Sequence, residues 1–293
     1  MAKQAVLKRI ILSKYLYVFI FIAGAVAFFY PLVSSMINHQ VQTRIIASYQ
    51  TELASYKQEQ KEKLRAEAQT YNRFLAALEG NVTDVLTEQE RDSTEIVYMN
   101  TLALGDVIGY LIIDKIEVEL PIYRGTSDEV LNAGIGHLER SSLPIGGPGS
   151  HAVLVGHRGL PSARYFRDLG LLEKGDIFLV NTLGETLAYE VQSISVVLPT
   201  EVESLLIQEN RDLCTLVTCE PYMINSHRLL VVGERRDYDP QLENKPLAQS
   251  SFPLRYWEYF VIIGTFSFLV ITLTLLQKYL RKKQLSGGSR DEN

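Results

Sequence analysis

Two long uncharged runs interrupt the alternation of apolar and polar positions along the chain. Tyr15–Ile37 contains 23 residues and Tyr259–Leu276 contains 18, and neither run carries a charged side chain. A helix needs about 20 mainly apolar residues to cross a bilayer. The pattern therefore predicts transmembrane helices over residues 15–37 and 257–277, the first ending unevenly near Pro31.

Basic residues flank both runs on their outer sides and predict their orientation. They are Lys3, Lys8, Arg9, Lys14, Lys278, Arg281, Lys282 and Lys283. Because positive flanks stay in the cytoplasm, we expect a cytoplasmic N-terminus (1–14), a cytoplasmic tail (278–293) and an extracytoplasmic middle. The predicted location is the cell membrane, with two passes.

A cleaved signal peptide is the alternative interpretation of the first run. That run is longer than the apolar core of about 7–15 residues in such a peptide, and no small-x-small cleavage site follows it closely. The pattern favours an uncleaved anchor.

Residues 38–104 are expected to form an extracytoplasmic helical extension. Within it, residues 40–79 contain neither Gly nor Pro, and their apolar positions recur every three to four residues, as in an amphipathic helix. We expect one helix that ends before Gly80. Residues 81–104 have weak periodicity and are predicted to connect this helix to the next domain.

Strand-like segments dominate residues 105–236. Seven segments alternate or are rich in β-branched residues: 107–114, 118–123, 151–157, 176–181, 186–197, 212–219 and 228–234. Asn181–Thr186 has the composition of a hairpin turn, and Thr126 with Glu129 predicts a short helix. Short strands with few helices predict a mainly β domain, a small closed barrel of seven or eight strands. Residues 237–256 are predicted to be a polar linker.

The charge balance argues against a nucleic-acid partner. The whole chain has a net charge of −5, and both terminal segments are basic, so the part between them is more acidic than the whole. Neutralising phosphates requires Lys and Arg.

The two cysteines, Cys214 and Cys219, are expected to be free thiols. Five positions apart on one strand, they would lie about 16 Å apart on opposite faces, whereas a disulfide needs Cα atoms within about 7 Å. Cys214 lies inside an apolar run and fits a buried filler residue. Cys219 ends its strand before Glu220-Pro221, where a side chain can meet a substrate.

A cysteine nucleophile needs a base or a positive neighbour. Of the five histidines, His157 ends a predicted strand and faces a loop, as Cys219 does. The other histidines fit surface or capping roles, although His137, His151 and His227 stay open as partners. Arg228 begins the strand after the cysteine loop and would lie near Cys219 if the two strands are neighbours. A guanidinium there could stabilise an oxyanion, and the N–H of Glu220 is a second candidate donor.

These motifs resemble the sortase family. The chain contains TLVTC, an arginine nine residues after its cysteine, and an upstream histidine in VLVGHRGLP. The resemblance covers residues 109–234 and implies an eight-stranded β-barrel. It implies that Cys219 is the nucleophile, His157 the general acid/base and Arg228 the stabiliser of the transition state. The implied reaction transfers an LPxTG-like sorting signal to an amine through a thioacyl enzyme.

The two apolar runs and EPYMINSHRLLVVGER are similar to class C sortases, which assemble pili. That similarity implies pilin subunits as partners, with a pilin lysine as the acceptor amine. Residues 81–104 lack the Asp-Pro-aromatic motif of the usual class C lid, and Met223 replaces the usual glycine. Two other functions stay open: attachment of proteins to a cell-wall precursor, and a non-catalytic pilus scaffold. No cofactor is expected, and no cluster has metal-ligand spacing.

Overall fold

The computed structural model describes residues 2–78, 98, 101–102, 105–160, 163–221 and 224–238, together with five residues between 264 and 272. The chain divides into two compact units, Met1–Asn244 and Lys245–Asn293. The described residues of the second unit are all helical. Most of the predicted linker (237–256) and of the second predicted span (257–277) therefore lies outside the described residues.

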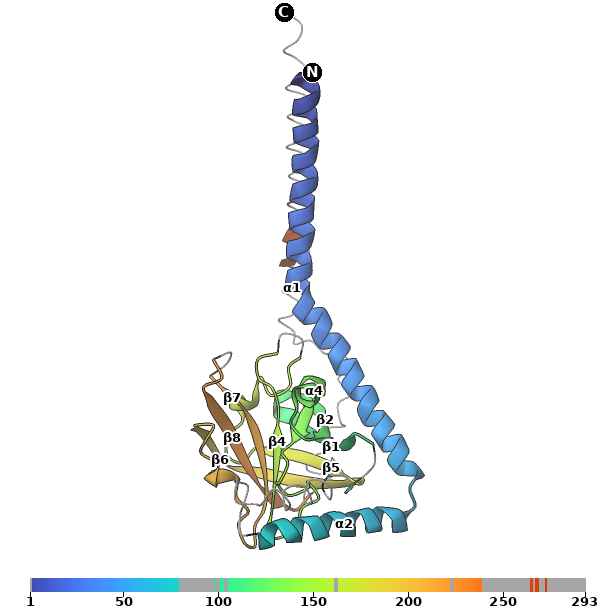
Figure 1. Ribbon diagram of the computed structural model, residues 1–293, viewed down its shortest axis with the longest axis vertical. Helices are drawn as coiled ribbons and strands as arrows, with labels where there is room; N and C mark the ends of the chain where they lie inside the picture. The colour runs from blue at the N-terminus through green and yellow to red at the C-terminus, as the bar shows by residue number, and fades with distance from the viewer. Residues whose placement is uncertain are drawn as a thin grey trace, which may run out of the picture. The chain divides into compact units, whose positions relative to one another are not determined.

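The first unit contains a closed β-barrel (Figure 1), as the alternating segments predict. Its strands are β1 (Val107–Ile113), β2 (Val118–Arg124), β3 (Ile135–His137), β4 (Ser150–Val155), β5 (Ile177–Thr182), β6 (Glu185–Val197), β7 (Asp212–Glu220) and β8 (His227–Arg236). Around the barrel they follow the order β1-β2-β3-β4-β7-β8-β6-β5. The pairs β2–β3 and β4–β7 are parallel, and every other neighbouring pair is antiparallel.

Seven of these strands overlap the seven predicted segments, and β3 is the eighth. The β5–β6 hairpin is also confirmed, because Leu183 and Gly184 form its two-residue turn with φ values of +56° and +81°. Two successive positive φ angles are typical of the turns that match the twist of a hairpin.

Short helices fill the connections, as predicted. They are α4 (Asp128–Ala133) and the 3-10 helices η1 (Asp114–Ile116), η2 (Leu169–Leu171) and η3 (Glu203–Leu205). The cap of α4 differs by one residue from the predicted Thr126. Ser127 caps the helix, and its side chain accepts a hydrogen bond from the Val130 N–H.

The N-terminal extension is helical but broken. Helix α1 (Ala2–Ser55) continues through Pro31, and α2 (Gln58–Ala77) follows a break at Tyr56 and Lys57. The prediction of one helix over 40–79 is therefore wrong, whereas the uneven end of the first span near Pro31 stays a prediction. Tertiary contacts explain the break, because each helix packs on a different part of the barrel unit.

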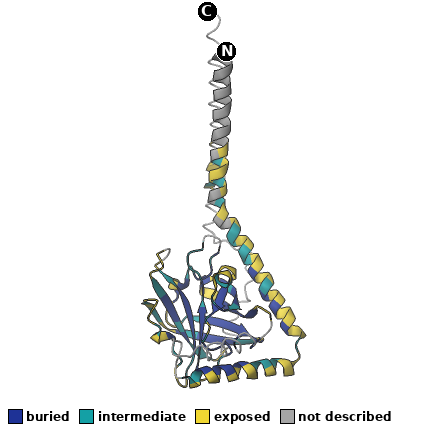
Figure 2. Cartoon of the chain, viewed as in Figure 1, coloured by how far each residue is buried: buried dark blue, intermediate teal, exposed yellow. Residues whose placement is uncertain are grey.

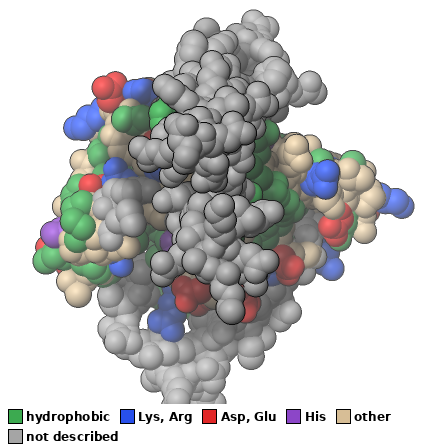
Figure 3. All heavy atoms as spheres, turned by 90° about the horizontal axis from the view of Figure 1, so that it is seen from above, with side chains coloured by type: hydrophobic (Ala, Val, Ile, Leu, Met, Phe, Trp, Pro, Cys, Tyr) green, Lys and Arg blue, Asp and Glu red, His purple; other side chains and the backbone are tan. Residues whose placement is uncertain are grey.

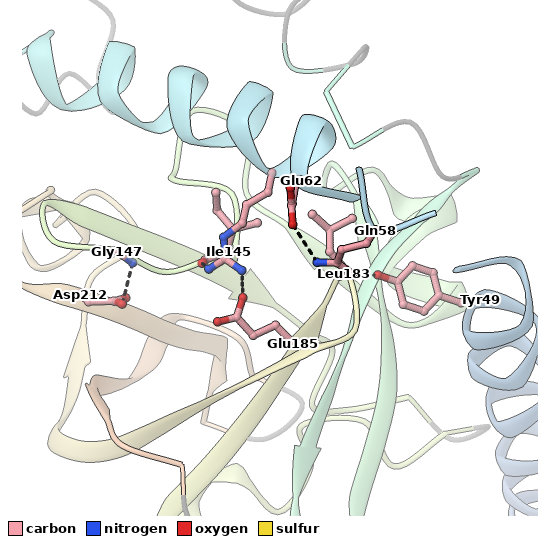
Figure 4. Close-up of polar contacts among 9 residues, drawn as sticks. Tyr49, Gln58, Glu62, Ile145, Gly147, Leu183, Glu185 and Asp212 are labelled. Carbon is pink, nitrogen blue, oxygen red and sulfur yellow. Dashed lines mark hydrogen bonds and ion pairs between the residues drawn. The ribbon is translucent and has the colours of Figure 1, made fainter. Parts of the chain in front are cut away.

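Helix α1 packs against β1, β2 and the β5–β6 turn, and α2 contacts β4 and the start of β6. The Tyr49 hydroxyl accepts a hydrogen bond from the Leu183 N–H at 3.0 Å, and the Gln50 amide donates to the Tyr110 hydroxyl at 3.0 Å. On α2, Arg65 forms an ion pair with Glu185. Figure 4 shows these two helices around the hairpin. Every residue of β1, which lies between β2 and β5, is buried.

The apolar core fills the barrel and extends under both helices. Figure 2 shows buried residues concentrated in the strands, with mixed buried and exposed positions along α1 and α2. A second, smaller cluster lies on the other face of β4, β7 and β8, beneath the β6–β7 connection. Its buried members are Val153, Leu205, Val217 and Leu230, and we call it the outer cluster.

Among the residues that the structure describes, no helix combines the length and the hydrophobicity needed to cross a membrane. The two predicted spans stay predictions.

The histidine on β3 predicts how stability depends on pH. His137 is fully buried and bonds to the Tyr98 hydroxyl through Nδ1 and to the Ser142 carbonyl through Nε2. Burial, aided by the nearby charge of Arg124, lowers its pKa to about 4. The folded protein therefore resists a proton that the unfolded chain accepts near pH 6.5. Stability from this group is present above that pH and is lost as pH falls toward 4.

We expect the free energy of unfolding of the parent protein to fall by about 2 kcal/mol more than that of His137→Gln between pH 7 and pH 5. Denaturant unfolding at both pH values measures this difference. Equal losses in the two proteins would contradict the prediction. All carboxylates are retained in the variant, so their titration cancels in the comparison.

Candidate active site

The cysteine and the arginine singled out in the sequence face each other across two neighbouring strands. Cys219 on β7 and Arg228 on β8 are direct partners in the antiparallel ladder. Directly opposed residues in such a ladder have Cα atoms about 4.5–5.5 Å apart. The condition set by the sequence, that the strands before and after the cysteine loop be neighbours, is therefore met.

Both side chains belong to the same face of the sheet. Val217 and Leu230 are paired two residues farther along the ladder, and both lie in the outer cluster. Because side chains alternate along a strand, Cys219 and Arg228 extend that face beyond its apolar part. Both are half-buried, so they are accessible from solvent.

His157 follows the end of β4, the other neighbour of β7. Strands β4 and β7 run parallel, with Val155 paired with Val217. The Gly156 N–H donates to the Val217 carbonyl at 3.0 Å, so the register continues past the end of β4. Continued for two residues beyond Val155, this register predicts His157 level with Cys219 and on the same face. The structure therefore pairs Cys219 with Arg228 and places His157 just beyond the end of the strand on the other side of β7.

The glycine before His157 lets the following loop fold back on the strand. A side chain at Gly156 would meet the Phe166 ring at 2.7 Å and the Ile135 side chain at 2.9 Å. The Phe166 N–H donates to the His157 carbonyl at 3.0 Å and closes the loop. Close packing therefore requires glycine at this position.

The other four histidines are buried in the barrel unit, lie on α1 or lie on the face of β8 opposite Arg228. His137 and His151 are fully buried, and His151 bonds to the Leu206 carbonyl and the Thr215 hydroxyl. Burial lowers the pKa of both imidazoles. His39 lies on α1, and His227 precedes Arg228 on β8, on the opposite face of that strand. Of the five histidines, His157 therefore has the geometry of a partner for Cys219.

The two cysteines are free thiols on one strand, β7, as the sequence predicts. Cys214 is fully buried, and burial raises the pKa of its thiol well above the usual value. It therefore stays protonated inside the barrel. Cys219, at the strand end, is half-buried and is the better candidate for a nucleophile.

One contact beside these residues was missed from the sequence. Arg158 and Glu220 immediately follow His157 and Cys219, and their side chains form an ion pair. Two opposite charges, each directly after a candidate residue, are the signal that could have revealed it.

Several sequence-based expectations are left open by the structure. Tyr222 and Met223 lie outside the described residues, as does most of residues 81–104. Tyr98, Thr101 and Leu102 of that segment are described and buried. A lid over the site is therefore not tested. The chemical roles of Cys219, His157, Arg228 and the Glu220 N–H stay predictions.

The charge distribution on the visible surface is mixed. In Figure 3 the described acidic and basic side chains lie in small separate groups and form no broad basic face. Within the described part of the chain, no group of three or more His, Cys, Asp or Glu could hold a metal ion.

Comparison with known proteins gives consistent similarities. Residues 111–236 match the model of the sortase domain. The chain is similar to the crystal structure of sortase C1 from Streptococcus agalactiae, with 42% identity, a TM-score of 0.62 and coverage of 67% of this chain and 100% of that one. It is also similar to sortase C of Clostridium perfringens, solved with the C-terminal cell wall sorting motif, with 39% identity, a TM-score of 0.58 and coverage of 67% and 100%.

A curated relative gives a weaker match. Sortase D of Bacillus subtilis is 33% identical over 135 residues, which cover 45% of this chain and 65% of that protein. The alignment thus spans just under two thirds of that relative.

Proposed function

This chain belongs to the sortase family, and we propose that it is a membrane-anchored cysteine transpeptidase that polymerises pilins. It would cleave an LPxTG-like sorting signal and join the signal to a lysine amine of a pilin subunit. The observation that supports this proposal is the pairing of Cys219 with Arg228 across β7 and β8, with His157 two residues beyond the end of β4, the other neighbour of β7. The similarity to two sortases C, one of them solved with a sorting motif, supports the choice of substrate.

The first half-reaction forms a thioester. The Cys219 sulfur, its thiol proton having passed to His157, attacks the carbonyl carbon between Thr and Gly of the signal, and a tetrahedral oxyanion forms. The Arg228 guanidinium and the Glu220 N–H donate hydrogen bonds to that oxyanion. His157 protonates the departing glycine amine as the C–N bond breaks. The acyl group is then held on the Cys219 sulfur.

The second half-reaction resolves the thioester. His157 removes a proton from the incoming lysine amine, which attacks the acyl carbon. A second tetrahedral intermediate uses the same donors. As it collapses, the C–S bond breaks, His157 returns the proton to the Cys219 sulfur, and the amide and the free thiol form. Two membrane anchors at residues 15–37 and 257–277 would hold the enzyme beside membrane-held substrates and raise their effective concentration.

Incubating the purified full-length protein with a sorting-signal peptide and hydroxylamine tests the thioester. We expect a hydroxamate of the peptide truncated after Thr, detected by mass spectrometry. Two further acceptors then separate the acceptor classes, a lysine-containing pilin and a cell-wall precursor mimic. Use of the mimic alone would overturn the pilin assignment, and the absence of any acyl transfer would overturn the enzymatic one in favour of a scaffold.

A further inference from the structure

We infer that the Arg158–Glu220 ion pair is a positioning device that fixes the spacing of His157 and Cys219. The inference rests on the proposed function of those two residues. Arg158 directly follows His157, and Glu220 directly follows Cys219. Their side chains join the two chain segments beyond the end of β4.

Among the described residues, the hydrogen bonds that join the β4 segment to β7 extend as far as Gly156 and Thr218. The Gly156 N–H donates to the Val217 carbonyl at 3.0 Å, and the Thr218 hydroxyl donates to the Gly156 carbonyl at 2.7 Å. Beyond Gly156 the chain turns into the loop closed by Phe166. The ion pair is therefore the cross-link immediately beyond the His157 and Cys219 positions.

The ion pair lies on the opposite face of the sheet from the candidate residues. By alternation, Arg158 shares a face with Ala152 and Leu154, and Glu220 shares one with Cys214 and Leu216. These four residues belong to the main core. His157, Cys219 and Arg228 extend the outer cluster instead. The pair thus lies behind the site and does not reach a substrate on its open face.

Packing around Arg158 supports this placement. Its Nε donates to the Arg167 carbonyl at 3.3 Å, and Nη2 lies 3.2 Å from where a Cβ on Gly170 would be. The same Gly170 position lies 3.7 Å from the side chain of Leu229, which belongs to the main core. The Arg158 side chain is only 16% exposed and that of Glu220 is 25% exposed. The guanidinium is therefore held between η2 and the end of β7.

The ion pair also affects the electrostatics of the site, because it neutralises a carboxylate next to Cys219. Glu220 places a carboxylate next to the residue whose substrate develops an oxyanion. Arg158 neutralises this carboxylate and directs it away from the reacting face. Loss of Arg158 would leave an unpaired negative charge beside the developing oxyanion, whereas loss of Glu220 would leave an unpaired positive charge, which does not oppose that oxyanion. The two single variants should therefore differ in severity.

The test uses the full-length variants Arg158→Gln, Glu220→Gln and the double variant. We expect Arg158→Gln to lower kcat by about 10- to 100-fold, because small displacements of reacting groups have effects of this size. The KM for the sorting peptide should change little, since the pair does not contact the substrate. Glu220→Gln should have a smaller effect, and the double variant should resemble Glu220→Gln. Arg158→Lys should restore part of the activity.

A matched control is the ion pair at the other end of β7. Arg211 forms a two-point contact with Glu234 on β8, at 2.8 and 3.0 Å. Arg211→Gln removes an ion pair made by the residue just before β7 and should leave kcat unchanged. Equal losses of kcat in Arg158→Gln and Arg211→Gln at equal melting temperatures would overturn the inference, and so would additive effects of Arg158→Gln and Glu220→Gln.

A readout without substrate separates this inference from the proposed function. Alkylation of Cys219 by iodoacetamide at pH 7 should slow by about threefold or more in Arg158→Gln and stay unchanged in Arg211→Gln. An unchanged rate in both variants would overturn the inference even if the parent protein catalyses transfer. A parent protein that transfers no peptide but shows the alkylation difference would overturn only the proposed function. If Arg158→Gln fails to fold, Glu220→Gln gives the test with the opposite sign: alkylation of Cys219 should be faster in Glu220→Gln than in Glu234→Gln, because the carboxylate beside the thiol is lost and the Arg158 charge remains.

Discussion

Replacing Cys219 with alanine should abolish both thioester formation and transpeptidation, lowering turnover by at least about 10⁴-fold. The change removes the atom that carries the acyl group, so no remaining side chain can take over the step. Product formation from a sorting peptide and a lysine-bearing acceptor, followed by mass spectrometry, measures the loss. Retained polymer formation in cells that express Cys219→Ala would contradict the catalytic role and favour a scaffold.

The second cysteine provides the matched control. Cys214 lies five residues earlier on the same strand and is fully buried. Cys214→Ala should retain activity and lose about 1 kcal/mol of stability, the usual scale for a small cavity. In the native parent protein, iodoacetamide should modify one thiol, and that thiol should be absent from Cys219→Ala. Loss of activity in a folded Cys214→Ala protein would contradict the assignment of the nucleophile.

The barrel is largely predictable from the sequence because its strands show their own patterns. Alternation and β-branched residues identify seven strands, and the Leu183–Gly184 turn identifies the β5–β6 hairpin. Strand β3 is not predicted, because it contains only Ile135, Gly136 and His137. Its pairing with β2 is parallel and is set by contacts outside the segment. A three-residue strand has no period that a sequence pattern can reveal.

In the helical extension the sequence predicts too much regular structure, a single helix where the structure has two. Residues 40–79 have strong helix formers throughout, so local propensity predicts one helix. The chain breaks at Tyr56 and Lys57 without Gly or Pro. Contacts far away in sequence determine where α2 lies, such as the hydrogen bonds of the Asn72 side chain to the backbone of Leu143. Helix propensity measures only the local contribution and not these tertiary contacts.

Part of the candidate site is predictable from the sequence, and part depends on long-range topology. The pairing of Cys219 with Arg228 follows from one short connection between two strands, so their spacing of nine residues is informative. The approach of His157 depends on the parallel pairing of β4 with β7, whose partners are more than 60 residues apart. Sequence alone places His157 at a strand end, and the topology brings it to Cys219. The Arg158–Glu220 ion pair is harder still to predict, because it requires both the strand topology and the direction of the two side chains.

Replacing Arg228 with alanine should lower kcat by about 10²- to 10³-fold and leave the KM for the peptide nearly unchanged. The reason is that a donor to an oxyanion acts in the transition state and contributes little to ground-state binding. The guanidinium is held in place by hydrogen bonds from Nη1 to the Asn225 and His227 carbonyls, at 3.1 and 3.0 Å. Arg228→Lys keeps the charge without the planar fork and should recover only part of the rate. Steady-state kinetics on the full-length protein measures both parameters.

Arg236, at the other end of β8, is the matched control for this change. It lies on the same strand and forms a half-exposed ion pair with Glu190 at 3.8 Å. Exposed pairs of this kind contribute about 0–1 kcal/mol, so Arg236→Ala should leave kcat unchanged and stability nearly so. A raised KM with normal kcat in Arg228→Ala would instead assign the arginine to substrate binding. Equal rates in the parent protein and Arg228→Ala would remove it from the site, although it directly faces Cys219 in the ladder.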